Sequence, residues 1–365
     1  MERKLRIGIT HGDINGVSYE VILKTLADPH IVEVCTPIVY GASKVAAYHR
    51  KALDLPPFNF NMITSAEYCA EGKVNMINCF EEELKVELAK ATPQAGEAAF
   101  LALEAATADL QAGFLDAIVT APINKHTIQS DRFDFPGHTE YFENRVGQGK
   151  KSLMILLNER IRVALVTTHV PLAKVPSLIT KDAILEKLAI FNSSLRDDFR
   201  IEKPRIAVLS LNPHAGESGL LGDEEQNVIV PALEEAGRQG ILCFGPYAAD
   251  GFFGSGHFAQ FDGVLAMYHD QGLAPFKTLA MDDGVNFTAG LPIVRTSPAH
   301  GTAYDITGKN VASELSFRNA LYLAADVCVN RARNKEERAN PLRKQYFDKS
   351  GDKEVLDLNT PEKED

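Results

Sequence analysis

The sequence predicts an α/β protein built around a largely parallel β-sheet. Short runs rich in β-branched residues alternate with longer segments of helical periodicity, which is the pattern of repeated strand–helix units. The chain has 365 residues, of which 45% are hydrophobic and 24% are charged, so it can form one large or two ordinary domains with a substantial core. Proteins of this class usually carry their chemistry just beyond the carboxyl ends of the parallel strands.

The first part of the chain predicts a series of strands and helices. A β-branched run, LRIGIT, leads into the loop HGDING, and a segment of helical periodicity follows. Two further strands and two further helices continue the alternation. Strands are predicted at residues 5–10, 37–41 and 116–120, and helices at 19–27, from Ser43 onward, and at 94–112.

The middle of the chain contains two apolar runs, 153–157 and 162–168, joined by three polar residues, which predicts a β-hairpin. Further strands are expected at 205–211, 263–268, 285–288 and 293–296, with helices at 181–195 and 224–238. From about Arg331 the composition becomes strongly charged, which favours one or two exposed helical turns and then a frayed tail.

Charge and composition exclude several classes of partner. Lys and Arg total 38 against 49 Asp and Glu, so the formal net charge of −11 argues against a nucleic-acid binder or an anionic membrane surface. A small basic pocket for one phosphate remains compatible with this charge. The five cysteines include no CxxC pair, and no run approaches the roughly 18 apolar residues of a membrane span. We expect a cytoplasmic protein.

Histidines follow several predicted strands. The chain has ten histidines, and His169, His214 and His269 come shortly after three separate strands of the middle segment. Neutral imidazoles are common ligands of divalent metals, and three of them with one open position form a catalytic rather than a structural site. The alternative is that each histidine caps a strand or binds a backbone carbonyl.

Two further groups of residues suit an anionic ligand. In the segment PGHTE, Thr139 can cap a helix that starts near Glu140, which leaves backbone N–H groups for a phosphate or carboxylate, with His138 as an added donor. Lys277, Asn286 and Arg295 follow at intervals of nine residues, and a Lys and an Arg beside an anion would let an acidic protein bind it. The alternatives are ordinary helix capping and surface charge.

Residues 297–309 form a glycine-containing polar loop that suits close approach of a ligand to the backbone. The loop is not a GxGxxG motif, and no such motif follows the first strand, so a standard Rossmann site is not supported. The glycine runs at 216–222 and 251–256 lack the Lys-Ser/Thr ending of a P-loop.

Taken together, these motifs resemble the PdxA family of 4-hydroxythreonine-4-phosphate dehydrogenases of pyridoxal 5'-phosphate biosynthesis. The resemblance covers about residues 7–330. Its motifs are GD..G at 12–16, TAPINK at 120–125, PGHTE at 136–140, TTHVPL at 167–172, LNPHAGE at 211–217, GP...D at 245–250, YHDQGL..FK at 268–277 and SPAHGTAYDI..K at 297–309. The first motif departs from the family's TPGDPAGIGPE, because this chain reads THGDINGVSYE: prolines are lost and Ser18 replaces a glycine.

The resemblance implies an isocitrate/isopropylmalate-dehydrogenase-like fold, with two α/β/α domains and a cleft between them. The expected first domain is discontinuous, residues 1–130 plus 285–335. The expected second domain, residues 131–284, carries the metal ligands and dimer contacts, and 336–365 form a charged tail beyond the family's usual end. The family also implies a homodimer with its active site near the subunit interface.

The resemblance assigns roles to individual residues. His169, His214 and His269 match the family's metal-ligand positions, contributed across the dimer. The residues that match its substrate contacts are His138, Thr139, Lys277, Asn286 and Arg295. His300 and Gly301, with Asp305 in the same loop, are similar to the adenosine-side nicotinamide loop of the wider dehydrogenase superfamily. Asp250 and Asp270 are candidates for the general base by position alone.

The implied reaction is the NAD- or NADP-dependent oxidation of 4-phosphohydroxy-L-threonine to 2-amino-3-oxo-4-phosphooxybutanoate, which decarboxylates to 3-amino-2-oxopropyl phosphate. One divalent metal per site would stabilise the developing alkoxide. Imidazole ligands favour zinc or cobalt over magnesium or manganese, although metal availability also decides. The hydride chemistry belongs to the nicotinamide.

Three alternatives stay open. A paralogous dehydrogenase of D-threonate or D-erythronate 4-phosphate would share the metal and phosphate sites and differ at C2 of the substrate. A metal-dependent hydrolase would use the three histidines without NAD(P) and without the 297–309 loop. A non-catalytic binding protein would leave the polar convergence unexplained.

Overall fold

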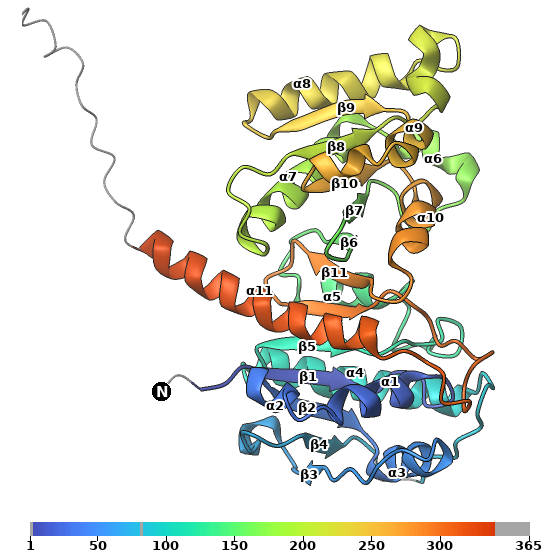
Figure 1. Cartoon of the computed structure of the whole chain (residues 1–365), viewed down its shortest axis with the longest axis vertical. Coiled ribbons are helices and arrows are strands. Elements are labelled where there is room, and N and C mark those ends of the chain that lie inside the picture. The colour runs from blue at the N-terminus through green and yellow to red at the C-terminus, as the bar shows by residue number, and fades with distance from the viewer. Residues whose placement is uncertain (1–2, 81–82, 340–365) are drawn as a thin grey trace, which may run out of the picture.

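The computed structural model describes residues 3–80 and 83–339 and contains one continuous twelve-stranded sheet (Figure 1). The strands are β1 (Arg6–Thr10), β2 (Thr36–Gly41), β3 (Asn61–Met62), β4 (Asn75–Asn78), β5 (Ala117–Thr120), β6 (Leu153–Leu157), β7 (Arg162–Leu165), β8 (Ile206–Leu209), β9 (Cys243–Tyr247), β10 (Gly263–Ala266), β11 (Val285–Ala289) and β12 (Arg295–Pro298). Their order across the sheet is β3-β4-β2-β1-β5-β12-β11-β6-β7-β10-β8-β9.

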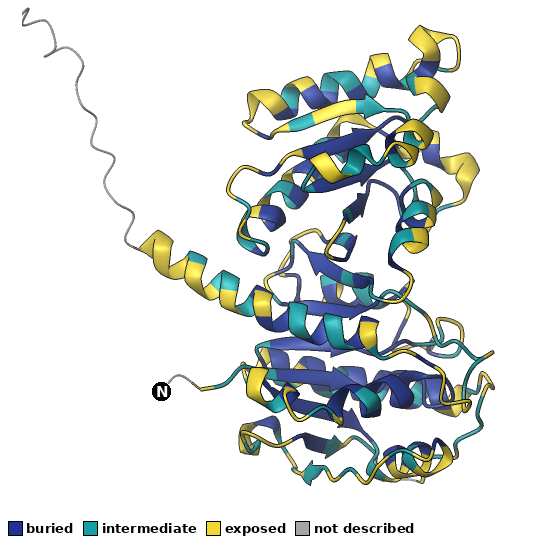
Figure 2. Cartoon of the chain, viewed as in Figure 1, coloured by how far each residue is buried: buried dark blue, intermediate teal, exposed yellow. Residues whose placement is uncertain are grey.

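Helices accompany the strands along the chain. They are α1 (Ser18–Leu26), α2 (Ile31–Val34), α3 (Ser43–Ala52), α4 (Pro93–Gln111), α5 (His138–Val146), α6 (Val175–Leu178), α7 (Lys181–Asp197), α8 (Val230–Arg238), α9 (Ala249–Gly254), α10 (His269–Ala280) and α11 (Leu315–Ala339). The inner strands of the sheet are buried, whereas the edge strands β3 and β9 and the outer faces of the helices are partly exposed (Figure 2). The predicted α/β class is confirmed.

The sheet is parallel on both sides and antiparallel in the middle. β1 pairs in parallel with β2 and β5, and β10 pairs in parallel with β7 and β8. Between these parts, β6 pairs antiparallel with β7 and with β11, and β11 pairs antiparallel with β12. The predicted 153–168 hairpin is therefore confirmed, although its second strand ends at Leu165. Strands from both expected domains belong to one sheet, and the domain boundaries stay a prediction.

Three strands were not predicted, and their sequences show why. β3 has only two residues, and β4 (NMIN) is bounded by asparagines instead of alternating apolar residues. β9 (CFGPY) contains Gly245-Pro246, which interrupts a strand pattern, and its pairing with β8 shifts register there.

The C-terminal helix is longer than expected. The sequence predicts one or two helical turns from Arg331 and a tail from 336, but α11 continues to Ala339. The first half of α11 packs against β5 and β12, and its second half extends away from the sheet (Figure 1). The rest of the predicted tail, 340–365, lies outside the described residues. No helix in the described ranges has the length and apolar content needed to cross a bilayer.

The altered first loop is filled by aromatic and imidazole side chains. The ring of His11 lies 5.5 Å from that of Tyr19, and the ring of Tyr19 stacks on His49 at 5.3 Å. Nε2 of His11 and Nε2 of His49 donate to the backbone carbonyls of Ala98 and Ile14. Burial lowers the pKa of both histidines to about 4, so both are neutral at pH 7. The residues that replace the prolines thus form a buried cluster.

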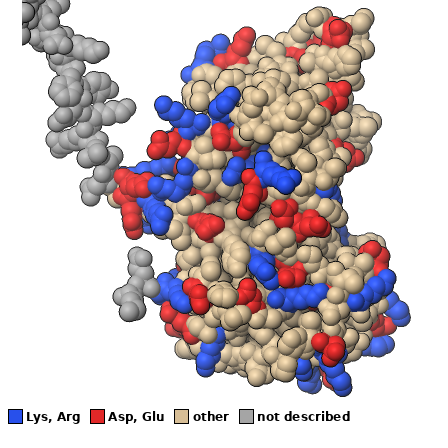
Figure 3. Space-filling view, viewed as in Figure 1, with Lys and Arg blue, Asp and Glu red and all other residues tan. Residues whose placement is uncertain are grey.

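Charged side chains of both signs are interspersed on the face shown in Figure 3. On this face the described residues form no extended basic surface of the kind that binds nucleic acid.

Two helical glycines should respond oppositely to substitution by alanine. In α4, a Cβ on Gly96 would lie 1.9 Å from the carbonyl oxygen of Thr127, in the loop after β5, whereas a Cβ on Gly237 in α8 would meet nothing within 4 Å. We expect Gly96→Ala to lower the free energy of unfolding by about 1–3 kcal/mol through overpacking. We expect Gly237→Ala to raise it by about 0.5–1 kcal/mol through helix propensity. Urea unfolding of both variants checks this, and an unchanged stability of Gly96→Ala would contradict the packing of α4 against the loop.

Candidate functional site

A cavity of about 260 Å³ lies at the antiparallel middle of the sheet, between its two parallel parts. Its walls come from the carboxyl end of β5, the loop after it, the start of α5, β6, α10, β11, β12 and the loop after β12. The predicted site residues that line it are His138, Thr139, His169, His269, Lys277, Asn286, Arg295, His300 and Gly301. Residues far apart in the sequence, from Thr120 to Gly301, thus meet in one polar cavity.

A larger cavity of about 880 Å³ lies between α7 and α11. Two of its cations are already compensated: Arg331 pairs with Asp198, and Arg338 with Asp197. It also lacks the histidines of the smaller cavity. We therefore assign the chemistry to the smaller one.

The amino-terminal end of α5 opens on the cavity. The helix begins at His138 with Gly137 as its N-cap, so the prediction that Thr139 caps the helix is wrong. Gly137 has no side chain and the N-terminus of α5 receives no side-chain cap, which leaves the N–H groups of the first turn available to an anion.

Three buried polar atoms in the cavity wall have no hydrogen-bond partner among the described residues: Nε2 of His138, Oδ1 of Asn286 and Nε2 of His300. An unsatisfied buried polar group costs about 1–3 kcal/mol. Such groups are rare in folded proteins unless a ligand or water binds them. Three of them in one cavity indicate a polar ligand. Burial lowers the pKa of His138 and of His300, so both imidazoles are neutral.

Arg295 places a positive charge in the wall of the same cavity. Its guanidinium is buried at the start of β12 and donates to Oγ1 of Thr120 at 2.6 and 3.1 Å and to Oγ1 of Thr288 at 3.2 Å. It forms no ion pair with a carboxylate in the described part of the chain, and burial lowers its pKa to about 9. At neutral pH the cavity therefore holds a buried cation that threonine hydroxyls solvate and that the Glu140 carboxylate of the same wall offsets only through space.

His169 and His269 face each other at a ring distance of 5.7 Å. His269, at the start of α10, has Nδ1 2.7 Å from Oδ1 of Asp270. His169 has Nδ1 4.0 Å from Oε1 of Glu140. The Asp270 carboxylate holds a proton on Nδ1 of His269 and leaves its Nε2 lone pair free, which is the arrangement of metal-ligating histidines. Nε2 of His169 instead lies 3.3 Å from Nζ of Lys125. Burial, then the charge of Lys125, lowers the pKa of His169 and favours its neutral form.

His214 also has a carboxylate beside its Nδ1, but it lies outside the cavity. Its Nδ1 lies 3.2 Å from Oε2 of Glu217, in a short helical turn, η3 (Pro213–Gly219), and the side chain is exposed. It does not line the cavity, and within 3–80 and 83–339 no group of three His, Cys, Asp or Glu side chains could hold a metal ion. One chain therefore brings together two of the three predicted metal ligands.

The η3 turn holds His214 in a left-handed backbone conformation, with φ of 51°. Three further non-glycine residues of the turn share this conformation, which costs about 1 kcal/mol or more per residue. Glu225 stabilises the segment, because its Oε1 accepts from the backbone N–H groups of Leu211 and Asn212 at 2.8 and 2.7 Å. The hydrogen bonds of Glu225 thus help to hold a strained turn on which the side chain of His214 is exposed.

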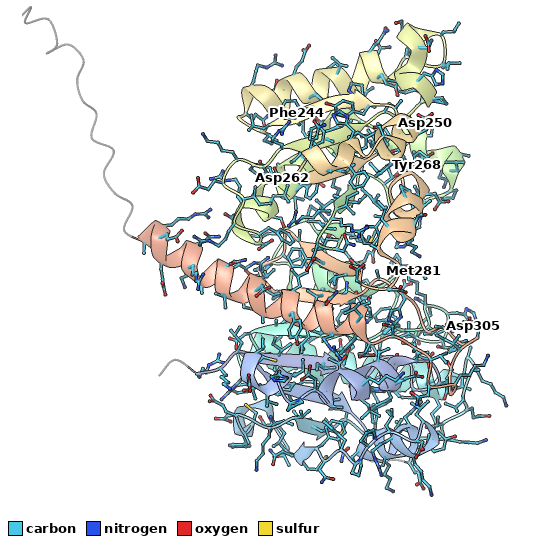
Figure 4. The ribbon with its side chains drawn as sticks, in the orientation of Figure 1. Phe244, Asp250, Asp262, Tyr268, Met281 and Asp305 are labelled. Carbon is cyan, nitrogen blue, oxygen red and sulfur yellow. The ribbon has the colours of Figure 1, made fainter. Side chains whose placement is uncertain are left out.

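The three predicted acidic residues lie outside this cavity. Asp270 accepts from His269, so its carboxylate orients that imidazole. Asp250 lies in the first turn of α9, on the same side of the molecule as Tyr268, and Asp305 lies at the outer edge of the other half (Figure 4). No side-chain hydrogen bond of Asp250 or Asp305 occurs among the described residues.

The two charged residues of the cavity wall that sequence reasoning missed are Lys125 and Glu140. Lys125 ends the TAPINK motif directly after β5, and Glu140 follows Thr139 in the PGHTE motif. Their positions at a strand end and in a helix's first turn were the available signals.

Comparison with known proteins places the chain in a family. The model of the family described as "Pyridoxal phosphate biosynthetic protein PdxA" matches residues 33–324. The protein called 4-hydroxythreonine-4-phosphate dehydrogenase in Bacteroides thetaiotaomicron is 62% identical over 98% of both chains. A protein of Oceanobacillus iheyensis, provisionally called D-threonate 4-phosphate dehydrogenase, is 38% identical over 90% of this chain and 99% of its own.

The fold is shared with a solved structure of the same family. The crystal structure of 4-hydroxythreonine-4-phosphate dehydrogenase from Klebsiella pneumoniae superposes with a TM-score of 0.75 at 33% identity, and covers 89% of this chain and 99% of that one. Sequence and structure agree, and the chain belongs to the PdxA family of pyridoxal phosphate biosynthetic proteins.

Proposed function

We propose that the chain is an NAD(P)-dependent, divalent-metal-dependent dehydrogenase of 4-phosphohydroxy-L-threonine, whose oxidised product decarboxylates to 3-amino-2-oxopropyl phosphate. The observation that carries the proposal is one cavity that combines the buried guanidinium of Arg295 with the facing imidazoles of His169 and His269. Relatives at 62% and 42% identity bear the name of this activity.

The anionic groups of the substrate bind at the positively charged end of the cavity. Arg295 and Lys277 supply charge, and the first turn of α5 supplies N–H groups at His138 and Thr139. Asn286 Oδ1, buried and unpaired, accepts from a donor group of the substrate. Several fixed contacts around one small ligand hold the reacting carbon in a single orientation.

The donor set fits a divalent metal. His169 and His269 would each bind the metal through Nε2, once Lys125 has left Nε2 of His169. His214 of the partner subunit would complete the set in a homodimer, because its own chain leaves it at the surface. Zinc suits three imidazoles, and magnesium, cobalt and manganese are the alternatives. When bound, the metal supplies Lewis-acid stabilisation of negative charge on the substrate alcohol, and the nicotinamide supplies the hydride acceptor.

The nicotinamide cofactor, NAD or NADP, binds along the 297–309 loop. His300 and Gly301 line the same cavity as the imidazole pair, which brings this loop to the reacting end of the substrate, whereas Asp305 is exposed farther along the loop. This adjacency favours a dehydrogenase over a metal-dependent hydrolase. Asp250 stays a candidate general base, and Asp270 acts through His269.

The second candidate function is oxidation of D-threonate or D-erythronate 4-phosphate, which the 38% identical Oceanobacillus relative favours. Both substrates carry the phosphate and the carboxylate that Arg295, Lys277 and α5 would bind. We also propose a cytoplasmic location, in keeping with five cysteines that are all free thiols in the structure.

Purified protein should reduce NAD+ or NADP+ with 4-phosphohydroxy-L-threonine, and a chelator should abolish the reaction. His269→Ala should lower kcat/KM by about a hundredfold or more through loss of the metal. Absorbance of the reduced nicotinamide measures both. Preference for D-threonate or D-erythronate 4-phosphate would move the chain to the second function, and no reduction with any substrate under several metals would contradict the dehydrogenase proposal.

Arg295→Met should separate function from stability. Loss of a charge-assisted contact should raise KM for the phosphorylated substrate about ten- to a hundredfold. The free energy of unfolding should stay equal or rise by about 1 kcal/mol, because a buried uncompensated charge is removed. The matched control is Arg331→Met, which breaks the pair with Asp198. It should lower stability and leave KM unchanged. An Arg295→Met protein that binds substrate normally would exclude Arg295 from the anion site.

A further inference from the structure

Lys125 lies between the two ends of the cavity. Its Nζ is 3.3 Å from Nε2 of His169 and 3.9 Å from the position that a Cβ on Gly137 would occupy, at the start of α5. It forms no ion pair with a carboxylate in the described ranges. One ammonium group thus faces both the proposed metal position and the proposed anion position.

The contact between Lys125 and His169 fixes which nitrogen accepts. An ammonium group only donates, so Nε2 of His169 carries the lone pair and Nδ1 carries the proton, on the side of Glu140. A divalent metal on His169 would take the same Nε2 lone pair. A lone pair serves one partner at a time, and an ammonium repels a dication at short range. Lys125 and the metal therefore compete for one atom.

The backbone that carries Lys125 is held on several sides. Oδ1 of Asn124 accepts from the N–H of Thr127 at 3.1 Å, and Nδ2 of Asn124 donates to the hydroxyl of Tyr304 at 3.1 Å. Tyr304 in turn donates to Oδ2 of the buried Asp13 at 2.5 Å. Departure of Lys125 from the imidazole is thus a rotation of its side chain, with α5 still within reach.

We propose that Lys125 couples the metal position to the anion position. In the empty enzyme its ammonium occupies the Nε2 lone pair of His169. When the phosphorylated substrate binds, the ammonium turns to the anionic group held at the start of α5, and the lone pair becomes free for the metal. By thermodynamic linkage, substrate tightens metal binding and metal tightens substrate binding by the same factor. The identity of the substrate, but not the competition at His169, rests on the proposed function.

The test measures binding rather than turnover. Co²⁺ is titrated into the full-length protein and followed by its visible absorption, with and without 4-phosphohydroxy-L-threonine and with no nicotinamide present. Lys125→Met should bind Co²⁺ alone about three- to tenfold more tightly than wild type, because a donor worth roughly a hydrogen bond no longer competes. Lys125→Met should bind the substrate more weakly than wild type does. The factor by which substrate raises the Co²⁺ affinity should also be smaller in Lys125→Met than in wild type.

Lys125→Arg should restore much of the coupling, because it restores the charge and the donor. The matched control is Lys51→Met, an exposed lysine of α3, which should leave both affinities unchanged. Equal or weaker Co²⁺ binding by Lys125→Met, or an unchanged effect of substrate on it, would overturn the proposal. The proposed function is tested separately: it fails if the wild-type protein reduces no NAD+ or NADP+ with 4-phosphohydroxy-L-threonine.

Discussion

The buried, uncompensated charge of Arg295 is the constraint on which the site depends. The sheet order places β12 between β5 and β11, so the guanidinium lies where the parallel and antiparallel parts meet and where only threonine hydroxyls solvate it. A charge in that position is costly unless an anion accompanies it. The acidic chain thus keeps one cavity with three cations, Lys125, Lys277 and Arg295, against one carboxylate, Glu140, and in the proposed function an anionic substrate supplies the missing compensation.

The cavity has two chemically distinct ends. Arg295 and the start of α5 form the proposed anion end. The imidazole pair forms the proposed metal end, where Asp270 orients His269. Lys125 lies between them. The first loop, the loop after β5 and the loop after β12 are joined by the hydrogen bonds of Asp13, Tyr304 and Asn124. The altered first loop, with its buried His11 and Tyr19, is therefore part of this connection.

The fold class and part of the candidate site could be predicted from the sequence, because both depend on local sequence patterns. The alternation of strands and helices gave the α/β class, and strand-end position singled out His169 and His269. The order of the strands, the joining of both halves in one sheet and the position of Gly137 as N-cap depend on tertiary packing, which a linear pattern does not record. Lys125 was missed because its importance lies in a contact across 44 residues. His214 is the opposite case: its position after a strand singled it out in the sequence, but within one chain it does not line the cavity.

The central claim is that a metal site is completed between two subunits, and mixing variants tests it most directly. His214→Ala and His269→Ala proteins, each inactive alone, are dissociated together, allowed to reassociate, and assayed for nicotinamide reduction. If His214 serves the partner's site, a mixed dimer has one intact and one doubly damaged site, so random exchange recovers about a quarter of wild-type activity. No recovery, with subunit exchange verified by distinct tags, would contradict the account, because His214 would then serve the site of its own chain.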